Sequence, residues 1–327
     1  MKIAILDDYQ DCVRSLACFA RLAGHEVIVL NQTFSDPAEL AARLPGVEAL
    51  VLIRERTRIT RALLERLPAL RAISQTGRAG PHIDTAACTA HGVVVLSGSG
   101  SPAAPAELTW ALVLAASRVV AQEAAALRAG RWQTTLGRTV RGRTLGILGY
   151  GNIGRLVAGF GKAFGMQVVT YGREATRVRA QADGVPVLAS QRDLFAASDV
   201  LSVHLRLVPE TRGIVGPGDL DAMRPDSLFV NTSRAELVVP GALLAALRAG
   251  RPGQAAVDVF ESEPGGDAEL IAHPHVLATP HLGYVERDSY ELYFGTAFDN
   301  LLAFAVGAPV NVVNPEASPA SAPPGQT

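Results

Sequence analysis

The 327-residue chain has few cysteines, almost no net charge and no long apolar run, and each of these features excludes a class of protein. Its three cysteines, Cys12, Cys18 and Cys88, show no metal-ligand spacing and no even framework, which argues against a disulfide scaffold. They predict reduced thiols in a cytoplasmic protein. The net charge of −1 leaves no basic footprint for nucleic acid or for an acidic membrane.

No apolar run approaches the roughly 20 residues that a membrane-spanning helix needs. Met1-Lys2 leads directly into the apolar run Ile3–Leu6, so we expect no signal peptide. What the chain does have is a hydrophobic content of 48% and a charged content of 19%, as in a well-filled globular protein. The length suits about two domains.

The stretch 149–154, Gly-Tyr-Gly-Asn-Ile-Gly, has the glycine spacing of a dinucleotide-binding turn. An apolar run at 144–148 precedes it, a helical pattern follows at 155–164, and a second apolar run lies at 167–171. Strand, glycine turn, helix and strand within one short unit form the context that this fingerprint requires.

Each glycine of this turn has a distinct expected role. Gly149 allows the tight turn, Gly151 lets the backbone approach a pyrophosphate, and Gly154 lets helix and strand pack closely. The helix N-terminus offers N–H groups and the positive end of its dipole to the phosphates.

The residues after the second strand bear on which nucleotide binds. An acidic side chain there would hold the ribose hydroxyl of NAD, whereas an arginine accommodates the 2′-phosphate of NADP. Gly172 occupies the usual acidic position and Arg173 follows it, with Arg177 and Arg179 close behind. This pattern favours NADP(H), while Glu174 keeps NAD(H) possible after a small shift of register.

The first hundred residues alternate between strand and helix patterns, which predicts a parallel, doubly wound sheet. Asp36 and Thr60 are expected N-caps of two of the helices. The predicted strands are Lys2–Leu6, Glu26–Leu30, Ala49–Ile53, Arg71–Gln75 and Val93–Leu96, and the predicted helices include Pro37–Leu44 and Arg61–Leu67.

A long helical pattern then runs from Pro105 to Ala129, and a second strand–helix series begins at Thr144. After Gly283 another helical pattern, Arg287–Val306, can return to the first domain. We therefore predict an α/β protein with two doubly wound parallel-sheet domains, in which a Rossmann cofactor domain is inserted in a discontinuous flavodoxin-like substrate domain. The predicted bounds are 1–99 with 284–314 for the substrate domain, 100–283 for the dinucleotide-binding domain and 315–327 for a disordered tail.

Three residues that can carry chemistry follow late strands of the second domain. Arg234 follows the predicted strand 227–231, Glu263 follows 255–259, and His281 follows 276–278. Ligands of open α/β sheets bind outside the carboxyl ends of the strands, so the active site is expected there, in a cleft between the two domains. A guanidinium can bind and polarise a 2-oxo acid, an imidazole can donate the proton, and a carboxylate can fix the imidazole tautomer.

The chain resembles the D-isomer-specific 2-hydroxyacid dehydrogenases along nearly its whole length. The resemblance is carried, in order and at the family's spacing, by Gly142–Gly154, Phe164–Met166, Ser202–Thr211, Val230–Arg234, Asp258–Pro264 and Thr279–Gly283. It implies that Arg234 binds and polarises the 2-oxo acid, that His281 is the acid/base and that Glu263 is its partner.

The resemblance also assigns binding residues. Thr76–Gly80 is similar to the loop whose backbone binds the substrate carboxylate, although Arg78 and Pro81-His82 depart from the usual pattern. Asp258 resembles the residue near the nicotinamide carboxamide, Thr109 one beside the cofactor, and His204 one at the cofactor edge. The expected cofactor-binding residues are Thr109, Gly149, Gly151, Asn152, Ile153, Gly154, Gly172, Arg173, His204, Thr232 and Asp258; the expected substrate-binding residues are Arg54, Gly77, Arg78, Ala79 and Arg234.

The function predicted from these features is reduction of a 2-oxo acid to a D-2-hydroxy acid with a nicotinamide cofactor, with glyoxylate or hydroxypyruvate as substrate. A phosphoglycerate dehydrogenase is the first alternative, because Arg54 and Arg78 could meet a phosphate, although we expect no long C-terminal regulatory domain. A non-catalytic nucleotide-sensing protein is the second, although it would not need the set Arg234, Glu263 and His281. His273 and His275 lack the further ligands of a metal site, so none is expected. By resemblance, the 105–129 region predicts a homodimer.

Overall fold

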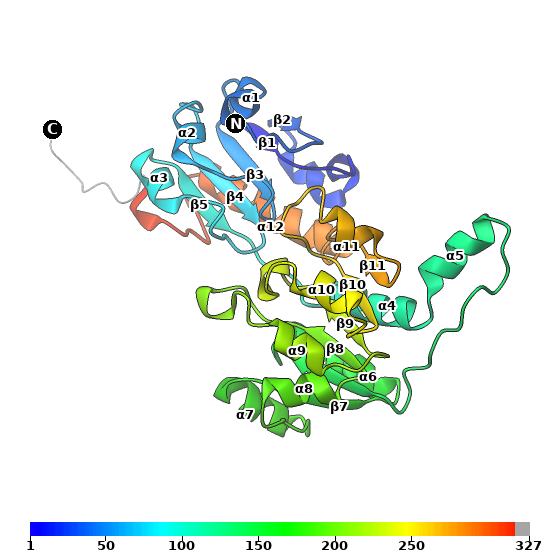
Figure 1. Cartoon of the computed structure of the whole chain (residues 1–327). Coiled ribbons are helices and arrows are strands. Elements are labelled where there is room, and N and C mark those ends of the chain that lie inside the picture. Colours follow the sequence, from blue (N-terminus) through cyan, green and yellow to red (C-terminus); the bar gives the residue numbers. More distant parts are fainter. Residues whose placement is uncertain (318–327) are drawn as a thin grey trace, which may run out of the picture. The chain divides into compact units, whose positions relative to one another are not determined.

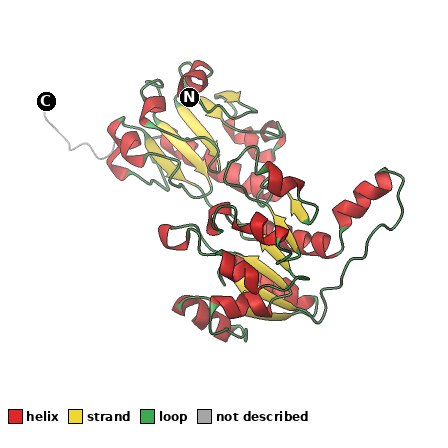
Figure 2. Ribbon diagram, viewed as in Figure 1, coloured by secondary structure: helices red, strands yellow, loops and turns green. Residues whose placement is uncertain are grey.

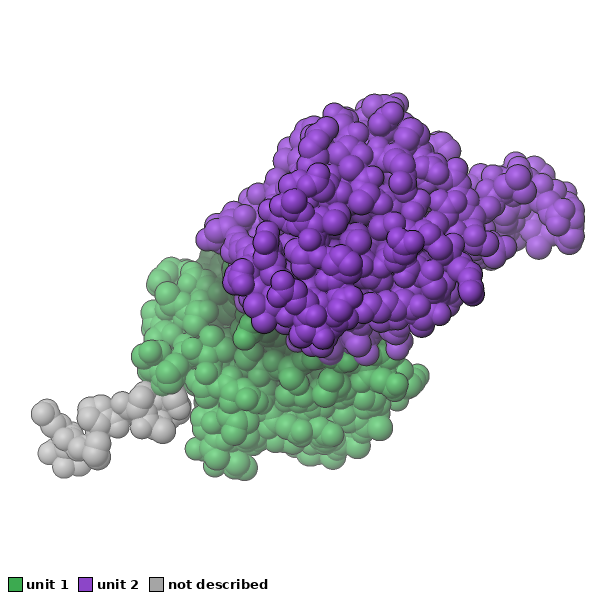
Figure 3. All heavy atoms as spheres, turned by 90° about the horizontal axis from the view of Figure 1, so that it is seen from below, with its two compact units in different colours: residues 1–101, 286–327 green, residues 102–285 purple. Residues whose placement is uncertain are grey.

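The computed structural model describes residues 1–317, which belong to two compact units (Figure 3). Unit 1 consists of Met1–Ser101 together with Glu286–Thr327, and unit 2 is the continuous segment Pro102–Val285. Each unit has a parallel sheet with helices on its faces, as Figure 2 shows, so the predicted α/β class with two parallel-sheet domains is confirmed.

Unit 1 has a five-stranded parallel sheet in the order β2-β1-β3-β4-β5. This is the flavodoxin-like order, in which the direction of strand addition across the sheet reverses between β1 and β3. Its strands are β1 (Lys2–Ile5), β2 (Glu26–Val29), β3 (Ala49–Ile53), β4 (Ala72–Thr76) and β5 (Val94–Ser97).

Short helices connect these strands, and their starts follow side-chain caps. Asp36 accepts a hydrogen bond from Ala38 N in α1 (Pro37–Ala42), and Thr60 accepts one from Leu63 N in α2 (Arg61–Leu64). Asp84 caps α3 (Thr85–Ala90) in the same way. The remaining elements of unit 1 are α12 (Arg287–Ala305) and the 3₁₀ turns η1 (Val13–Ser15), η2 (Ala17–Leu22) and η5 (Pro315–Ala317).

The helix α12 supplies much of the aromatic core of unit 1. Tyr290, Phe294, Phe298 and Phe304 are buried along its length, and it packs against β4, β5 and η2. Arg21 of η2 pairs with Asp299 at 2.7 Å, which fastens the exposed side of the contact. The last part of the chain therefore completes the core of the first.

Unit 2 has a six-stranded parallel sheet in the order β11-β10-β9-β8-β6-β7 (Figure 1). Beyond β7, a single parallel bridge joins Thr170 to Val187, so a reduced third strand completes the Rossmann order 3-2-1-4-5-6, and β11 is a seventh strand beside β10. The strands are β6 (Thr144–Leu148), β7 (Gln167–Tyr171), β8 (Val200–Val203), β9 (Leu228–Asn231), β10 (Gln254–Val257) and β11 (Val276–Ala278).

The two faces of this sheet take alternate residues of each strand. Leu145 and Ile147 pack on one face with α4 and α6, while Leu148 packs on the other with α8–α10. The helices of unit 2 are α4 (Ala103–Ser117), α5 (Val120–Arg128), α6 (Asn152–Ala163), α7 (Glu174–Ala182), α8 (Gln191–Ala197), α9 (Pro217–Ala222), α10 (Ala242–Arg248) and α11 (Ala268–Ala272), with 3₁₀ turns η3 (Pro209–Thr211) and η4 (Ala235–Leu237).

The prediction of one long helix from Pro105 to Ala129 is wrong. The chain forms α4 and α5, which meet at a bend of 61°. Val119 at the junction has a left-handed backbone with φ of 48°, which an α-helix cannot contain. Among residues 1–317, no single helix is long and apolar enough to cross a membrane, and the only pair that passes together is this bent one.

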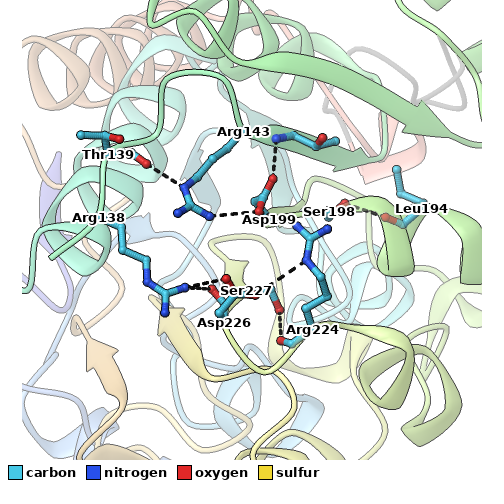
Figure 4. A network of polar contacts seen from close by, with 10 residues as sticks. Arg138, Thr139, Arg143, Leu194, Ser198, Asp199, Arg224, Asp226 and Ser227 are labelled. Atoms are coloured by element: carbon cyan, nitrogen blue, oxygen red, sulfur yellow. Dashed lines mark hydrogen bonds and ion pairs between the residues drawn. The ribbon is translucent and has the colours of Figure 1, made fainter.

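The helix α5 and the segment that follows it extend away from the sheet of unit 2 (Figure 1). We call residues 118–143 the arm. Arg138 closes its base, because its Nη1 donates to the carbonyl of Asp226 at 2.8 Å and lies 2.9 Å from the carboxylate of the same residue. Figure 4 shows the rest of this network, in which Asp199 pairs with Arg143 and Arg224. The arm is therefore anchored at the amino ends of β6, β8 and β9.

The assignment of a substrate domain and a dinucleotide-binding domain, with its predicted bounds, stays a prediction. The compact units divide at 101/102 and 285/286. The predicted disordered tail, 315–327, falls largely on 318–327, which lie outside the described residues. For Pro315–Ala317 the prediction is wrong, because these residues form η5, where Ala317 N donates to the carbonyl of Asn314 at 3.0 Å.

Candidate active site

The glycine turn follows β6 at the carboxyl edge of unit 2. Gly149 has φ of 103°, and a Cβ there would lie 2.6 Å from the carbonyl oxygen of His204. A Cβ on Gly154 would lie 2.3 Å from the carbonyl oxygen of Gly149. Neither position can take a side chain, because the chain itself approaches too closely.

Gly151 differs from its two neighbours. A Cβ on this residue would meet nothing within 4 Å, so open space lies over the backbone at the start of α6. Asn152 and Ile153 form the first turn of that helix, where backbone N–H groups face outward. The open space beside a helix N-terminus fits the pyrophosphate of a dinucleotide.

A polar cluster fixes the turn from behind. The buried Tyr150 donates its hydroxyl to Asp183 at 3.0 Å, and Arg155 of α6 pairs with the same carboxylate at 2.8 Å. Burial, followed by the contact with Asp183, raises the pKa of Tyr150 to about 12. The glycine turn, α6 and the end of α7 are thus tied together.

The end of β7 carries the residues expected to select the nucleotide. Arg173 is exposed and lies directly before α7, and Glu174 is the first residue of that helix. A Cβ on Gly172 would lie 2.7 Å from Cβ of Thr176. The absence of a side chain at Gly172 is therefore required by packing against α7, whatever the nucleotide.

Thr109 and Thr232 meet inside unit 2. Thr109, on α4, is fully buried, and its hydroxyl lies 2.7 Å from that of Thr232 in the loop after β9. It also donates to the carbonyl of Pro105 at 2.7 Å. The two predicted cofactor-binding residues therefore form one polar contact at the carboxyl edge.

The loop that carries Arg234 is organised by Asn231. This buried side chain accepts from Ser233 N at 3.0 Å and donates to the carbonyl of Arg234 at 2.9 Å. Ser233 in turn donates to the carbonyl of Val203 at 2.8 Å, and Arg234 Nη1 donates to the carbonyl of Ser233 at 2.7 Å. The backbone at Arg234 is thus held at the end of β9.

Asp258 organises the loop that carries His281. Its buried carboxylate accepts from Thr279 Oγ1 at 2.6 Å, from Leu282 N at 2.7 Å and from Gly283 N at 2.9 Å. Burial raises the pKa of Asp258, although these hydrogen bonds and the nearby His281 oppose the rise. The carboxylate thus binds residues that precede and follow His281 in the sequence, and it holds the loop that carries this histidine.

Glu263 and His281 are in direct contact. Oε2 of Glu263 lies 2.6 Å from Nδ1 of His281, and Oε1 accepts from Phe260 N at 2.9 Å. His281 has φ of 53°, and its ring lies edge-on to Tyr284 with centroids 5.6 Å apart. The carboxylate of Glu263 therefore occupies the Nδ1 side of the ring. Glu261 is exposed and takes no part in the pair.

His204 is held differently. Its Nε2 lies 2.9 Å from Ser202 Oγ, and burial lowers the pKa of His204 to about 3, so the ring is neutral. The backbone carbonyl of His204 is the group that excludes a side chain from Gly149. Its place beside the glycine turn agrees with a role in shaping the cofactor edge.

The residues expected to bind substrate besides Arg234 lie in unit 1. Arg54 follows β3, and the loop of Gly77, Arg78 and Ala79 follows β4. Ala79 N donates to Ser97 Oγ at 3.2 Å, Gly77 has φ of 83°, and Arg78 is exposed. These residues share the carboxyl edge of the unit 1 sheet.

Among the described residues no group of three or more His, Cys, Asp or Glu side chains is arranged to hold a metal ion. The rings of His273 and His275 lie 5.7 Å apart, but no third ligand joins them.

Comparison with known proteins decides the family. Residues 110–283 match the model for the NAD binding domain of the D-isomer specific 2-hydroxyacid dehydrogenases. The chain belongs to this family. It is therefore a nicotinamide-dependent oxidoreductase on the same fold as its relatives.

Several dehydrogenases of the family are similar over most of the chain. A glyoxylate reductase of Aeropyrum pernix is 40% identical over 271 residues, which are 79% of this chain and 81% of the relative. A D-3-phosphoglycerate dehydrogenase of Methanocaldococcus jannaschii is 35% identical over 75% of this chain, but only 47% of the relative is covered. The chain thus spans about half the length of that relative.

Solved structures of the family are more similar still. A crystal structure described as a putative D-3-phosphoglycerate dehydrogenase from Ralstonia solanacearum has 56% identity and a TM-score of 0.95, with 97% of both chains covered. A phosphoglycerate oxidoreductase from Vibrio cholerae has 55% identity and a TM-score of 0.91, with 94% of this chain and 100% of the other covered.

Two residues of this dehydrogenase were missed by sequence reasoning as parts of the site. The sequence places Asn231 at a strand end and in the motif Val230–Arg234 without a role for its side chain, although an amide three residues before a candidate arginine is a signal for a loop anchor. Gln75, 1% exposed, was likewise taken only as the end of a strand, with nothing to suggest what its side chain binds.

Proposed function

We propose that this dehydrogenase reduces a 2-oxo acid to the D-2-hydroxy acid, with glyoxylate or hydroxypyruvate as its substrate. The observation that carries the proposal is the 2.6 Å contact between Glu263 and His281, on the sheet edge that also bears Arg234. A histidine whose Nδ1 is bound to a carboxylate presents Nε2 as a proton donor.

Three residues of unit 2, His281, Glu263 and Arg234, have separate roles in the proposed reduction. The reduced nicotinamide, when bound, supplies the hydride to the carbonyl carbon. Nε2 of His281 gives its proton to the carbonyl oxygen, and Glu263 stabilises the protonated ring before that transfer. The guanidinium of Arg234 stabilises negative charge on the same oxygen, a term that often dominates such catalysis.

We further propose that the substrate carboxylate is bound by the backbone N–H groups of Gly77 and Arg78, with Ala79 at the end of the same loop and Arg54 beside it. Gly77 has φ of 83°, a conformation that turns successive N–H groups toward one point, as in anion-binding nests. The 3.2 Å bond from Ala79 N to Ser97 Oγ holds the loop in this form.

A phosphoglycerate dehydrogenase-like activity is the second candidate. Arg54, Arg56 and Arg78 place three cations in the loops after β3 and β4, where a substrate phosphate would be neutralised. The two structural relatives with 55–56% identity carry descriptions of this kind.

One panel of substrates tests the reaction and separates the candidates. Glyoxylate, hydroxypyruvate, pyruvate and 3-phosphohydroxypyruvate would each be supplied with NADPH or NADH, and oxidation of the cofactor followed. We expect turnover of glyoxylate and hydroxypyruvate with the larger kcat/KM. A kcat/KM that is highest for 3-phosphohydroxypyruvate would favour the second candidate, and no turnover of any acid would contradict both and favour a nucleotide-binding protein.

For the cofactor we propose a preference for NADP(H) over NAD(H). The exposed Arg173 follows β7 at the position where a guanidinium would pair with the 2′-phosphate, and Nε of Arg177 lies 3.4 Å from the carbonyl of Gly172. A charge-assisted pair is worth about 1.5–3 kcal/mol, or roughly ten- to a hundredfold in affinity.

The test of this preference leaves Gly172 unchanged, because a side chain there would collide with Thr176. We expect a lower KM for NADPH than for NADH, and R173A should raise only the KM for NADPH, by about tenfold or more. R66A, which alters an exposed arginine of unit 1, is the control. A parent enzyme that prefers NADH would show that Glu174 binds the ribose instead.

We propose that the chain forms a homodimer through the arm. Leu127, Trp132 and Leu136 are 58%, 76% and 93% exposed there, which is unusual for large apolar side chains. A second copy would bury them in a two-fold contact. Light scattering at micromolar concentration should give twice the monomer mass of 34.3 kDa, and the double variant W132S/L136S should give the monomer.

The three cysteines are all free in the structure. Together with the family's cofactor use, this supports a cytoplasmic location, where thiols stay reduced. Fractionation of the native cells, followed by detection of the protein, would test this.

A further inference from the structure

Arg54 has an unusual backbone for an arginine. Its φ is 54°, in the left-handed region that costs a non-glycine residue free energy. Such strain persists only where the surroundings enforce it, and it often marks a functional position. Arg54 lies directly after β3, at the carboxyl edge of unit 1, where ligands of parallel sheets bind.

Two buried side chains at the end of β4 hold this backbone from both sides. The amide N–H of Arg54 donates to Thr76 Oγ1 at 3.2 Å, and its carbonyl accepts from Gln75 Nε2 at 2.7 Å. Gln75 is 1% exposed and Thr76 is 2% exposed. The backbone N–H and carbonyl of Arg54 are therefore both hydrogen-bonded by adjacent residues of β4.

Gln75 is in turn oriented by His82. Nε2 of the glutamine donates to the carbonyls of Arg54 and of Thr76, so its Oε1 must accept. Nε2 of His82 lies 3.0 Å from that oxygen and is therefore the protonated nitrogen of the ring. Burial lowers the pKa of His82, which agrees with a neutral ring that donates through Nε2.

The side chain of Arg54 is directed at the neighbouring loop. A Cβ on Gly77 would lie 3.1 Å from Nη1 of Arg54, so the guanidinium covers the glycine that opens the loop after β4. Next to it, a Cβ on Gly80 would lie 3.3 Å from Nδ1 of His82. The same ring thus packs against the other end of the loop.

We propose that His82 and Gln75 are positioning residues that set the affinity for the 2-oxo acid, because together they fix the Arg54 guanidinium over the Gly77–Gly80 loop. His82 orients Gln75, Gln75 holds the left-handed carbonyl of Arg54, and Arg54 presents its charge at the loop. The inference rests on the proposed binding of the substrate carboxylate by Arg54 and this loop. It adds a buried relay that determines where that charge lies.

The relay explains why two polar side chains are buried behind a loop that they do not form. Without the Gln75 donor, the carbonyl of Arg54 loses its partner and the strained peptide can relax to a β conformation. The guanidinium would then leave Gly77, because rotation of the backbone redirects the side chain. The loss should appear in substrate affinity and hardly at all in the cofactor site, whose residues lie in unit 2.

The experiment is a double-mutant cycle on steady-state kinetics with glyoxylate and NADPH, or with the substrate and reduced cofactor that the panel selects. We expect Q75L to raise the KM for the 2-oxo acid about ten- to thirtyfold, with kcat changed less than about threefold. In the R54A background, Q75L should change KM less than about twofold, because its effect passes through Arg54. Cofactor affinity, measured by fluorescence titration, should stay the same in all four proteins.

Variants at His82 separate the relay from general stability. H82F removes the donor and should raise KM about as Q75L does, whereas H82N keeps an N–H donor and should restore part of the affinity. H91F is the matched control, because His91 is exposed in unit 1 and only bonds the carbonyl of Ala87 at 2.8 Å. Thermal unfolding identifies variants that fail to fold, and the milder Q75M then replaces Q75L in the cycle.

The outcomes distinguish the two hypotheses. A full Q75L effect that persists in the R54A background, or a Q75L protein with unchanged KM, would overturn the relay while leaving the reaction intact. A parent enzyme that turns over no 2-oxo acid would instead overturn the proposed function. An R54A protein with unchanged KM would remove Arg54 from the substrate site and the relay with it.

Discussion

The carboxyl edges of the two sheets both lie at the ends of parallel strands, but they present different chemistry. In unit 2 the first strand ends in a glycine turn, and Gly151 leaves open space over the backbone. In unit 1 the loop after the first strand contains Asp7, a buried residue with φ of 63°, and the third strand is followed by Arg54, with φ of 54°. The edge of unit 2 leaves open space over the backbone of its glycine turn, whereas the edge of unit 1 also holds an acidic and a basic residue in left-handed backbone conformations.

The difference follows from what each edge is proposed to bind. A pyrophosphate is recognised by N–H groups and a helix dipole, which need small residues and close approach. A small acid offers little surface, so its recognition depends on the placement of one or two charges. Glycine is used where the backbone is the binding group, and hydrogen-bonded strain where a side chain is.

The largest effect is expected from the edge of unit 2 that carries the chemistry. H281N removes the proton donor and should lower kcat by about 10²–10⁴-fold. Asparagine tolerates the left-handed backbone at this position, so the loop should keep its form. H275N, which alters an exposed histidine of the same unit, is the control. An unchanged kcat would mean that another residue is the acid.

The next effect concerns Arg234, where charge alone is not enough. R234K keeps the charge but loses the planar fork, so we expect kcat/KM for the 2-oxo acid to fall on the order of 10²-fold. Cofactor affinity should hardly change. R212K alters an exposed arginine in a neighbouring loop and should be silent. Weakened cofactor binding with normal substrate kinetics would place Arg234 in the nucleotide site instead.

Two glycine variants should behave in opposite ways. G149A introduces a Cβ 2.6 Å from the carbonyl of His204 at a positive φ, so the protein without cofactor should lose about 1–3 kcal/mol of stability. G151A meets no atom within 4 Å and should leave that stability unchanged, yet weaken cofactor binding by about tenfold or more. Thermal unfolding with and without cofactor measures both. A G151A protein with normal affinity would mean that the phosphates lie elsewhere.

The Glu263–His281 pair predicts a shift in pH dependence rather than a large loss. A carboxylate stabilises a protonated imidazole more than an amide does. Reduction requires that protonated form, so E263Q should move the falling limb of the kcat/KM profile to lower pH. E261Q, an exposed neighbour, should reproduce the parent profile. An E263Q profile identical to the parent's would show that the pair does not act in catalysis.

The smallest effect is expected from Asp7 in unit 1. Burial raises the pKa of Asp7, although hydrogen bonds from Thr33 and Thr57 oppose the rise. The folded state binds the proton more tightly than the unfolded chain, so the stabilisation from this group is lost as pH rises through the folded pKa, above its ordinary value of 3.8. D7N should raise the free energy of unfolding at pH 7 by up to about 1 kcal/mol and flatten that dependence. D11N changes an exposed aspartate that also has a positive φ, 48°, and is the control.

Much of the fold could be predicted because parallel sheets leave a direct record in the sequence. Buried strands such as Ala49–Ile53 are continuous apolar runs, and caps such as Asp36 and Thr60 mark helix starts. The break of the 105–129 helix could not be predicted in this way. Val119 is apolar and fits the helical spacing, and only its left-handed backbone reveals the bend.

The candidate active site likewise has parts that the sequence predicts and parts that it does not. His281, Glu263 and Arg234 could be proposed from the sequence because each follows a strand and belongs to a family motif. The contacts of Asn231 and Gln75 could not be proposed, because a buried amide has no periodicity and its partners here are the loop carbonyls of Arg234 and Arg54. Gly172 was expected to favour NADP(H), which stays a prediction, and the contact with Thr176 that requires a glycine here depends on the exact start of α7.

The position of α12 has a consequence for the order of events during synthesis. Its aromatic side chains complete the core around β4 and β5, yet the ribosome makes α12 roughly 190 residues after β5. At a synthesis rate of about 5–20 residues per second, the apolar face of the first sheet stays without α12 for roughly 10–40 s. Unit 2, which is continuous, can fold completely in that interval. A nascent chain arrested before Arg287 should therefore contain a folded nucleotide-binding unit and an unfinished, chaperone-dependent first sheet.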